Sequence, residues 1–258
     1  MSLKPLILVT NDDGISAPGI RSLVKIMNLI GDVVVVAPDS PQSAMGHAIT
    51  VNSTLHCSKV EIDSGPQREY SCSGTPADCV KLAINELLDR KPDICVSGIN
   101  HGSNSSINII YSGTMGAAIE AGIQGIPAIG FSLLDYRSDA NFEPYIKFVK
   151  LITENTMNNK IPQNSVLNVN MPSVNSEKEI KGVKICRQAD ANWVEKFDKR
   201  KNPMGKKYYW LTGDFIDNDK GKDTDEWALS KNFISIVPVQ YDFTDYPMIQ
   251  KLNTWDFE

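Results

Sequence analysis

The sequence predicts an α/β fold built on a doubly wound, mostly parallel sheet, and three observations support this. Short apolar runs such as Leu6–Thr10 and Asp32–Ala37 recur along the first half of the chain. Segments with a helical spacing of apolar residues separate these runs, and glycine, proline, serine and asparagine cluster at the junctions. Near-continuous apolar runs are typical of strands buried on both faces, and strands joined by helices pair in parallel through right-handed crossovers.

The first two strands and the helix between them are the clearest elements. Leu6–Thr10 is the expected first strand, and Asp32–Ala37 is the second because its run of valines suits a strand better than a helix. The intervening helix has Ser16 as its candidate N-cap and Pro18 in its first turn, and Gly31 is expected to end it. The apolar stripe of this helix comprises Ile20, Leu23, Val24, Met27 and Ile30.

The following segment is less regular and ends in a well-marked helix start. A loop rich in proline, serine and glycine covers residues 38–47, and weaker strands are expected near 48–62 and 68–72. The residues Thr-Pro-Ala-Asp at 75–78 then combine a hydroxyl cap, a proline at the first helical position and an acid at the third. This helix is expected to run to about Asp89.

Two more strands and one more helix complete the regular part of the pattern. Asp93–Ser97 is a further buried strand, and a long loop from Gly98 to Gly113 follows it. A helix rich in small residues is expected over Thr114–Gln124, and Pro127–Ser132 is expected to be a strand.

The alternation of strands and helices is less regular in the second half of the chain. A helix near 142–157 and a strand at Val166–Asn170 complete the sheet, so we expect an α/β core over residues 1–175. Residues 176–258 are expected to form a β-rich extension, with short strands at Val183–Arg187, Lys207–Leu211 and Ile234–Val239. The extension contains all four tryptophans, which suit either a subunit interface or a self-packed appendage: Trp193, Trp210, Trp227 and Trp255.

Composition and charge disfavour several classes of partner. The chain has 258 residues, 41% of them apolar, and a net charge of −5, which argues against a nucleic-acid duplex or an anionic membrane as partner. Basic residues gather over Lys196–Lys207, where a solvated surface is the simpler interpretation. The first strand begins by Leu6 and no apolar run reaches membrane-spanning length, so we expect a cytoplasmic protein. The cysteines contain no C-x-x-C motif and are expected to be reduced thiols rather than a disulfide framework or a zinc site: Cys57, Cys72, Cys79, Cys95 and Cys186.

Polar residues follow three of the predicted strands. Asp12 and Asp13 come directly after the first strand and precede Gly14, which permits a sharp turn. Since ligands bind beyond the carboxyl ends of strands in open α/β sheets, these acids, a hydroxyl of the second loop and Asn100 are expected to converge if the strands are neighbours. Two carboxylates at one point repel unless a cation lies between them or one holds a proton. This oxygen-rich set suits Mg²⁺, Mn²⁺ or Ca²⁺, and the alternative is a turn without any ligand.

The second half of the candidate site is the helix start at Tyr111–Thr114. A helix N-terminus offers unpaired N–H groups and a partial positive charge, and the hydroxyls of Ser112 and Thr114 can bond phosphate oxygens. The alternative is that Thr114 is only an N-cap and that the small residues serve close packing. If a site for a hard metal ion lies beside this helix start, anion binding becomes a better interpretation than simple capping. A metal site next to an anion-binding helix start predicts phosphoryl transfer or phosphate-ester hydrolysis.

Five ordered sequence blocks resemble the SurE family, the survival-protein nucleotidases. The blocks are Thr10–Gly14 with Ala17–Gly19, Ala37–Asp39 with Gln42 and Ser43, Ser73–Val80, Ser97–Asn104, and Tyr111–Thr114. A weaker similarity covers residues 223–225 and 234–238. Any one block would be unspecific, but five in the same order are highly specific.

The resemblance implies a 5′-nucleotidase, a metal-dependent phosphatase that acts on nucleoside 5′-monophosphates, with 3′-monophosphates as further candidates. It implies Asp12, Asp13, Ser43 and Asn100 as ligands of one divalent ion per subunit, Mg²⁺ or Mn²⁺, with Ca²⁺ as a third candidate. It also implies a Rossmann-like core and a C-terminal extension exchanged between subunits of a homodimer or homotetramer. The chain departs from the family at Ala44, because a glycine commonly follows the serine ligand.

The resulting hypothesis is hydrolysis by a metal-activated water, with Asp12 and Asp13 as the catalytic pair. The expected phosphate contacts are Ser43, Asn100, Asn104, Ser112, Gly113 and Thr114. Alternatively, one aspartate serves as base or nucleophile, and His47 or His101 can act as a hydrogen-bond donor or general acid. A phosphatase of the haloacid-dehalogenase type fits poorly, since it needs an Asp-x-Asp spacing. The non-enzymatic alternative is a catalytically silent nucleotide-binding regulator.

Overall fold

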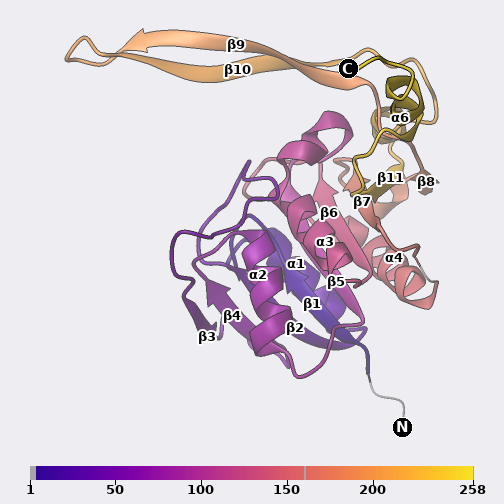
Figure 1. Ribbon diagram of the computed structural model, residues 1–258. Coiled ribbons are helices and arrows are strands. Elements are labelled where there is room, and N and C mark those ends of the chain that lie inside the picture. Colours follow the sequence, from indigo (N-terminus) through magenta and orange to yellow (C-terminus); the bar gives the residue numbers. More distant parts are fainter. Residues whose placement is uncertain (1–3, 160, 258) are drawn as a thin grey trace.

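The central feature of the protein is a single twisted sheet. The computed structural model describes residues 4–159 and 161–257, so the outermost residues of both expected regions lie outside the described part. Over these residues, the sheet has nine strands in the order β3-β4-β2-β1-β5-β6-β7-β11-β8, and its layout can be followed in Figure 1. Its strands are β1 (Leu6–Thr10), β2 (Asp32–Pro38), β3 (Cys57–Val60), β4 (Arg68–Cys72), β5 (Ile94–His101), β6 (Ala128–Leu133), β7 (Ser165–Met171), β8 (Val183–Ile185) and β11 (Ile234–Gln240). All pairs from β4 through β7 in this order are parallel, so the predicted mostly parallel α/β fold is confirmed.

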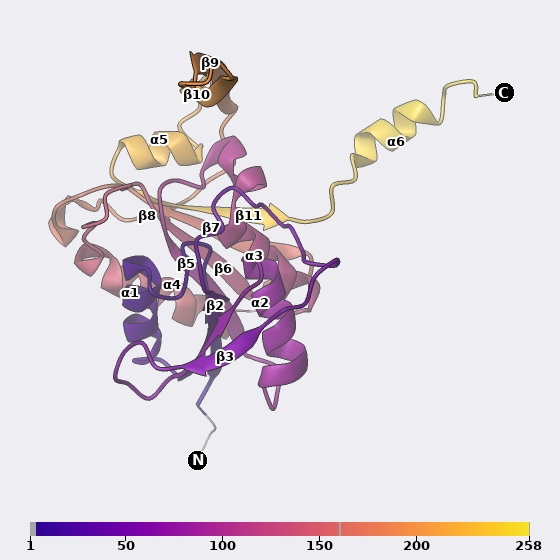
Figure 2. The same cartoon turned by 90° about the vertical axis from the view of Figure 1, so that its left-hand side faces the viewer.

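Helices cover both faces of the sheet. α1 (Pro18–Met27) and α4 (Ile146–Asn158) contribute to one apolar core, and α2 (Pro76–Leu82) and α3 (Gly113–Ile123) contribute to the other, as Figure 2 also shows. The remaining short helices are a π-helical turn at Ala83–Leu87 and 3₁₀ helices at Ser106–Tyr111, Glu143–Tyr145 and Glu177–Glu179.

The boundaries of α1 differ from the sequence prediction. Ser16 is not the N-cap, because Ala17 occupies that position and makes no side-chain capping bond. The helix ends at Met27 rather than at Gly31. Gly31 instead permits a close approach to the chain before β1, since a Cβ there would lie 2.3 Å from the carbonyl oxygen of Pro5.

Capping side chains set the starts of α2 and α3. Thr75 and Asp78 form the capping box that the sequence predicts. α3 begins at Gly113, and its N-cap is Ser112, whose Oγ accepts a backbone N–H of the first turn at 3.0 Å. Thr114 therefore lies inside the helix and is not its cap, which leaves its hydroxyl available for another partner.

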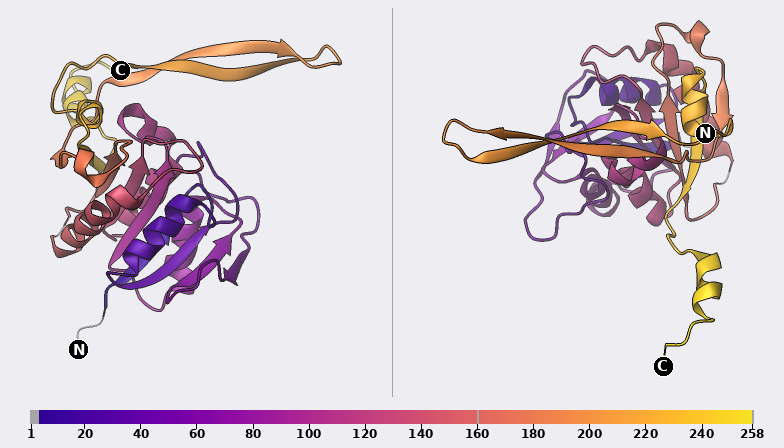
Figure 3. Two further views of the ribbon diagram at one scale, coloured as in Figure 1. Left: turned by 180° about the vertical axis from the view of Figure 1, so that it is seen from behind. Right: turned by 90° about the horizontal axis from the view of Figure 1, so that it is seen from above.

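The region beyond residue 175 divides between the sheet and two projecting segments. β8 and β11 belong to the central sheet, and α5 (Asp225–Ser230) precedes β11. β9 (Ala191–Lys201) and β10 (Lys207–Asp217) form a long antiparallel hairpin that extends from the body, and α6 (Tyr246–Leu252) projects separately (Figures 1 and 3). β10 contains the strand expected at 207–211, whereas β9 has no counterpart in the sequence prediction. Among the described residues, no helix combines the length and apolarity needed to cross a lipid bilayer.

The segment between β2 and β3, residues 39–56, is fastened to α2 and α3 by a buried carboxylate. Glu120 on α3 is 2% exposed, and its two oxygens bond His47 Nε2 at 2.9 Å and Lys81 Nζ at 2.8 Å. Burial alone would raise the pKa of Glu120, but hydrogen bonds from His47, Lys81 and Gln124 lower it to about 2. One carboxylate thus joins the segment to both helices.

We expect Glu120→Gln to destabilise the fold by about 2 kcal/mol near neutral pH, because an amide cannot accept bonds from both neighbouring donors. The folded-state pKa of Glu120 lies below its ordinary value of 4.5, so its contribution to stability is full above that value. The contribution is lost as the pH falls towards about 2. Urea unfolding of both proteins at pH 7 and pH 3 should therefore give a difference in unfolding free energy that shrinks in acid.

The matched control is Glu86→Gln, which changes an exposed carboxylate in the turn that continues α2. It should leave the free energy of unfolding nearly unchanged at both pH values. A Glu120→Gln protein as stable as this control at pH 7 would contradict the anchoring role.

Candidate metal and phosphate site

The order of the central strands brings the predicted site segments to one edge of the sheet. β1 lies between β2 and β5, and Thr10, the last residue of β1, pairs with Ser97 within β5. The backbone N–H of Gln42, beside Ser43, donates to the carbonyl of Asp12 at 2.7 Å. The backbone N–H of His101, which follows Asn100, donates to Asp13 Oδ2 at 3.1 Å. The loops after β1, β2 and β5 are therefore bonded to one another through the two aspartates.

Asp12 is enclosed by the start of α3. Its side chain is buried, and Thr114 Oγ1 donates to Asp12 Oδ1 at 2.5 Å. Gly113 packs directly against it, since a Cβ at Gly113 would lie 2.8 Å from Asp12 Cβ and 3.0 Å from Asp12 Oδ2. Burial raises the pKa of Asp12 to about 6, against the opposing hydrogen bond from Thr114, and the charge of Asp13 adds a smaller upward contribution.

The pKa of the Asp13 carboxyl group is also raised. Burial raises its pKa above the ordinary value, and the N–H of His101 only partly offsets this. The neighbouring carboxylates therefore both disfavour their own ionisation in the absence of a counterion. A cation at this point would lower both pKa values and stabilise the doubly ionised pair.

The donor set at this edge fits a hard cation. Among the described residues, no group of three or more histidine, cysteine, aspartate or glutamate side chains is arranged to hold a metal ion. Asn100 donates its Nδ2 to the carbonyl of Gly102 at 2.9 Å, which leaves Oδ1 as its atom able to ligate. Carboxylate, amide and hydroxyl oxygens together suit Mg²⁺, Mn²⁺ or Ca²⁺.

Three buried polar atoms on or beside the central strands lack a partner. Thr10 Oγ1 at the end of β1, Asn11 Oδ1 directly after it and Ser97 Oγ within β5 have no hydrogen-bond partner within the described part of the chain. Ser43 lies on an exposed stretch of the segment after β2. The residue that follows it, Ala44, has φ +60°, so the loop keeps the left-handed conformation that favours glycine although its residue carries a Cβ.

The expected phosphate contacts occupy different environments. Ser112 caps α3 and Thr114 bonds Asp12, so both hydroxyls already have a partner in the protein. Asn104 lies in a buried amide network, where its Nδ2 donates to Ser132 Oγ and its N–H to Asn170 Oδ1, both at 2.8 Å. The start of α3, where backbone N–H groups lack partners in a preceding turn, lies next to Asp12.

The two candidate histidines differ in their partners. His47 Nε2 bonds Glu120, as described above. His101 Nδ1 lies 3.1 Å from the carbonyl oxygen of Arg137, and its ring packs edge-on against Phe142 with centroids 5.3 Å apart. A catalytic role for either histidine stays a prediction.

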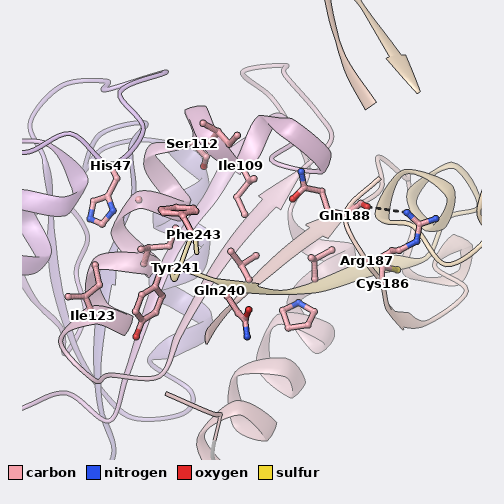
Figure 4. Close-up of a pocket in the computed structure, with 16 residues that line it drawn as sticks. His47, Ile109, Ser112, Ile123, Cys186, Arg187, Gln188, Gln240, Tyr241 and Phe243 are labelled. Atoms are coloured by element: carbon pink, nitrogen blue, oxygen red, sulfur yellow. Dashed lines mark hydrogen bonds between the residues drawn. The ribbon is translucent and has the colours of Figure 1, made fainter. Parts of the chain in front are cut away.

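A cavity of about 680 Å³ adjoins the start of α3 (Figure 4). Its lining is mostly apolar and comes from α3, β11 and the chain leading to α6. Ser112 and His47 border it on the side of the predicted site, and Tyr241 and Phe243 border it on the side of the C-terminal segment. Neither this cavity nor the contacts of Glu120 and Lys81 can be predicted from the sequence, because the residues involved are far apart in the chain and no local motif marks them.

Comparison with known proteins places these features in a family. The family model described as Survival protein SurE matches residues 7–195. A protein of Flavobacterium johnsoniae named 5′-nucleotidase SurE is 68% identical over 252 residues, covering 98% of this chain and 97% of that protein. A protein of the same name from Flavobacterium psychrophilum is 66% identical over 253 residues, covering 98% of both chains.

A solved structure agrees with the sequence comparisons. The crystal structure of the SurE protein from Aquifex aeolicus superposes with a TM-score of 0.83 at 37% sequence identity, covering 96% of this chain and 98% of that one. The resemblance inferred from the five sequence blocks is thus confirmed over nearly the whole chain, and the chain belongs to the SurE family.

Proposed function

We propose that this chain is a divalent-metal-dependent phosphohydrolase that removes phosphate from nucleoside 5′-monophosphates, with 3′-monophosphates as further candidates. The observation that carries the proposal is the adjacent pair Asp12 and Asp13, whose pKa values are both raised and which lie beside the first turn of α3. An oxygen-rich anionic pair beside an anion-binding helix start suits a cation on one side and a phosphate on the other. The 5′-nucleotidase name of the closely similar proteins supports the substrate class.

The proposed cation ligands are Asp12, Asp13, Ser43 and Asn100. When bound there, Mg²⁺ or Mn²⁺, with Ca²⁺ as a further candidate, would neutralise phosphate charge and lower the pKa of a coordinated water. Thr114 holds the Asp12 carboxylate in place through a hydrogen bond to Oδ1.

Besides holding the cation, the protein would have to bind and orient the phosphate. The backbone N–H groups at the start of α3, beginning at Gly113, would donate hydrogen bonds to the phosphate oxygens next to the aspartates. Ser112 and Asn104 would each have to exchange or share a present hydrogen bond to contact a phosphate. The pocket beside Ser112 offers apolar surface for the rest of a nucleotide.

We expect Asp12→Asn and Asp13→Asn each to lower kcat/KM for nucleoside monophosphates by more than about 100-fold, because each removes a charged oxygen from the proposed cation site. Asp32→Asn is the matched control, since Asp32 is exposed at the opposite end of the neighbouring strand β2. Steady-state assays should be paired with circular dichroism to verify folding. Near-wild-type turnover in both folded variants would refute the assignment.

Removal of divalent ions should abolish hydrolysis of p-nitrophenyl phosphate and of nucleoside monophosphates. Added Mg²⁺ or Mn²⁺ should restore it, because hard cations match the predicted oxygen ligands. Full activity after exhaustive chelation would contradict the metal dependence. Tight nucleotide binding without turnover under any metal would instead identify a nucleotide-binding regulator.

We also propose that the chain forms a homodimer or homotetramer. The hairpin β9–β10 and the segment around α6 extend from the body (Figure 3) and carry large exposed apolar side chains. Trp210 is 60% exposed on the hairpin, and Phe243 is 91% exposed before α6. Apolar aromatic side chains on projecting segments are typical of surfaces that a partner covers, and a second copy of this chain is the proposed partner.

Light scattering coupled to gel filtration should give a mass of two or four chains for the full-length protein. Deletion of residues 244–258 should lower that mass or weaken the assembly on dilution, because it removes the projecting helix. Leu29→Ser, which changes an exposed apolar residue on the body, is the control and should leave the mass unchanged. A full-length protein that runs as a single chain at tens of micromolar would contradict the proposal.

A further inference from the structure

Three cysteines meet at the β3–β4 edge of the sheet. Cys57 on β3 and Cys72 on β4 are direct partners in the antiparallel pairing of these strands. Their Sγ atoms lie 2.8 Å apart, and both thiols are free. Cys79, in the first turns of α2, donates a hydrogen bond to the Cys72 sulfur from the other side.

The backbone at this pair already suits a covalent link. Residues directly opposite each other in an antiparallel pair have Cα atoms about 4.5–5.5 Å apart, which lies within the range that disulfides span. Formation of an S–S bond would therefore require no movement of β3 or β4 beyond small side-chain rotations. Neither Cys95 nor Cys186 has another cysteine as a hydrogen-bond partner among the described residues, so the β3–β4 edge is the place in the described chain where thiols meet in this way.

Position in the sheet makes the pair accessible to a small oxidant. β3 is the terminal strand of the sheet, and the Cys57 side chain is half-buried there. Cys72 is 1% exposed, but the hydrogen bond from Cys79 lowers its thiol pKa, which favours the thiolate that reacts with peroxides.

The pair also marks both ends of the segment that carries Ser43. At the start of this segment, the N–H of Asp39 donates to the carbonyl of Cys72 at 2.7 Å. At its end, His56 and the residue after Cys72, Ser73, exchange hydrogen bonds of 2.9 and 3.0 Å. Residues 39–56 thus leave the sheet beside Cys72 and return to it beside Cys72.

We propose that Cys57 and Cys72 form a reversible thiol oxidation site, and that their disulfide closes the base of segment 39–56. Hydrogen peroxide converts the Cys72 thiol to a sulfenic acid and releases one water. The Cys57 sulfur then attacks the Cys72 sulfur, forms the S–S bond and releases the second water. Two thiols and one peroxide thus give one disulfide and two waters, and a dithiol reductant reverses the step.

The test treats the full-length protein with hydrogen peroxide and follows its intact mass. We expect a loss of about 2 Da, the mass of two hydrogens, which dithiothreitol restores. Trypsin separates Cys57 from Cys72, since Lys59 and Arg68 lie between them, so only a disulfide keeps the two peptides joined. The joined peptides should be absent in Cys57→Ser and in Cys72→Ser.

Two control variants make the assignment specific. Cys186→Ser and Cys79→Ser should both retain the joined peptides after oxidation. A link that persists in Cys72→Ser, a disulfide confined to the peptide that holds both Cys72 and Cys79, or oxidation to sulfinic acid alone would each overturn the proposal.

The structural consequence is measured by hydrogen exchange. Amide exchange over residues 39–56 should be slower in the oxidised than in the reduced protein, and this difference should vanish in Cys57→Ser. Equal exchange in both redox states would overturn the closing of the segment. These measurements involve no phosphatase assay, so their outcome is independent of the proposed function.

Discussion

The structure of the site depends on the burial of two neighbouring carboxylates that the fold holds in place. Asp12 is buried against Gly113, and its carbonyl and carboxylate are both engaged by other segments. Asp13 follows it and accepts an N–H from the end of β5. Burial raises both pKa values, so the protein holds an arrangement of acids that is unfavourable without a positive charge. A change of conformation cannot relieve the cost of this burial, because packing and backbone hydrogen bonds hold both residues.

The surrounding elements can be understood as supports for that arrangement. The parallel order β2-β1-β5 aligns three loop-bearing strand ends, and α3 approaches closely enough that only glycine fits at position 113. Glu120, further along the same helix, fastens segment 39–56 through His47. The helix thus contributes the N-terminus at which we propose that phosphate binds, a hydrogen bond to Asp12 and an anchor for the segment that carries Ser43. These roles fall on one rigid element of eleven residues.

Much of the fold could be predicted because its signals are local. The valine-rich strand β2, the capping box of α2 and the strand–Asp–Asp–Gly sequence after β1 each need only a few consecutive residues to interpret. The hairpin strand β9 escaped prediction because it packs against β10 rather than a core, so its sequence lacks the alternation of buried and exposed residues. Long-range contacts could not be predicted from the sequence either, since Glu120 lies 73 residues from His47 and 39 from Lys81. The side-chain partner of Thr114 likewise followed from tertiary packing and not from the helix-start pattern.

The most direct test of this account is a crystal structure of the protein soaked in Mn²⁺, with anomalous data collected to locate the ion. We predict one strong anomalous peak per chain at the carboxyl ends of β1 and β5, with oxygens of Asp12, Asp13, Ser43 and Asn100 at about 2.0–2.3 Å. A peak bound elsewhere, or a well-occupied peak that these four side chains do not surround, would contradict the central claim that the paired aspartates exist to hold a cation.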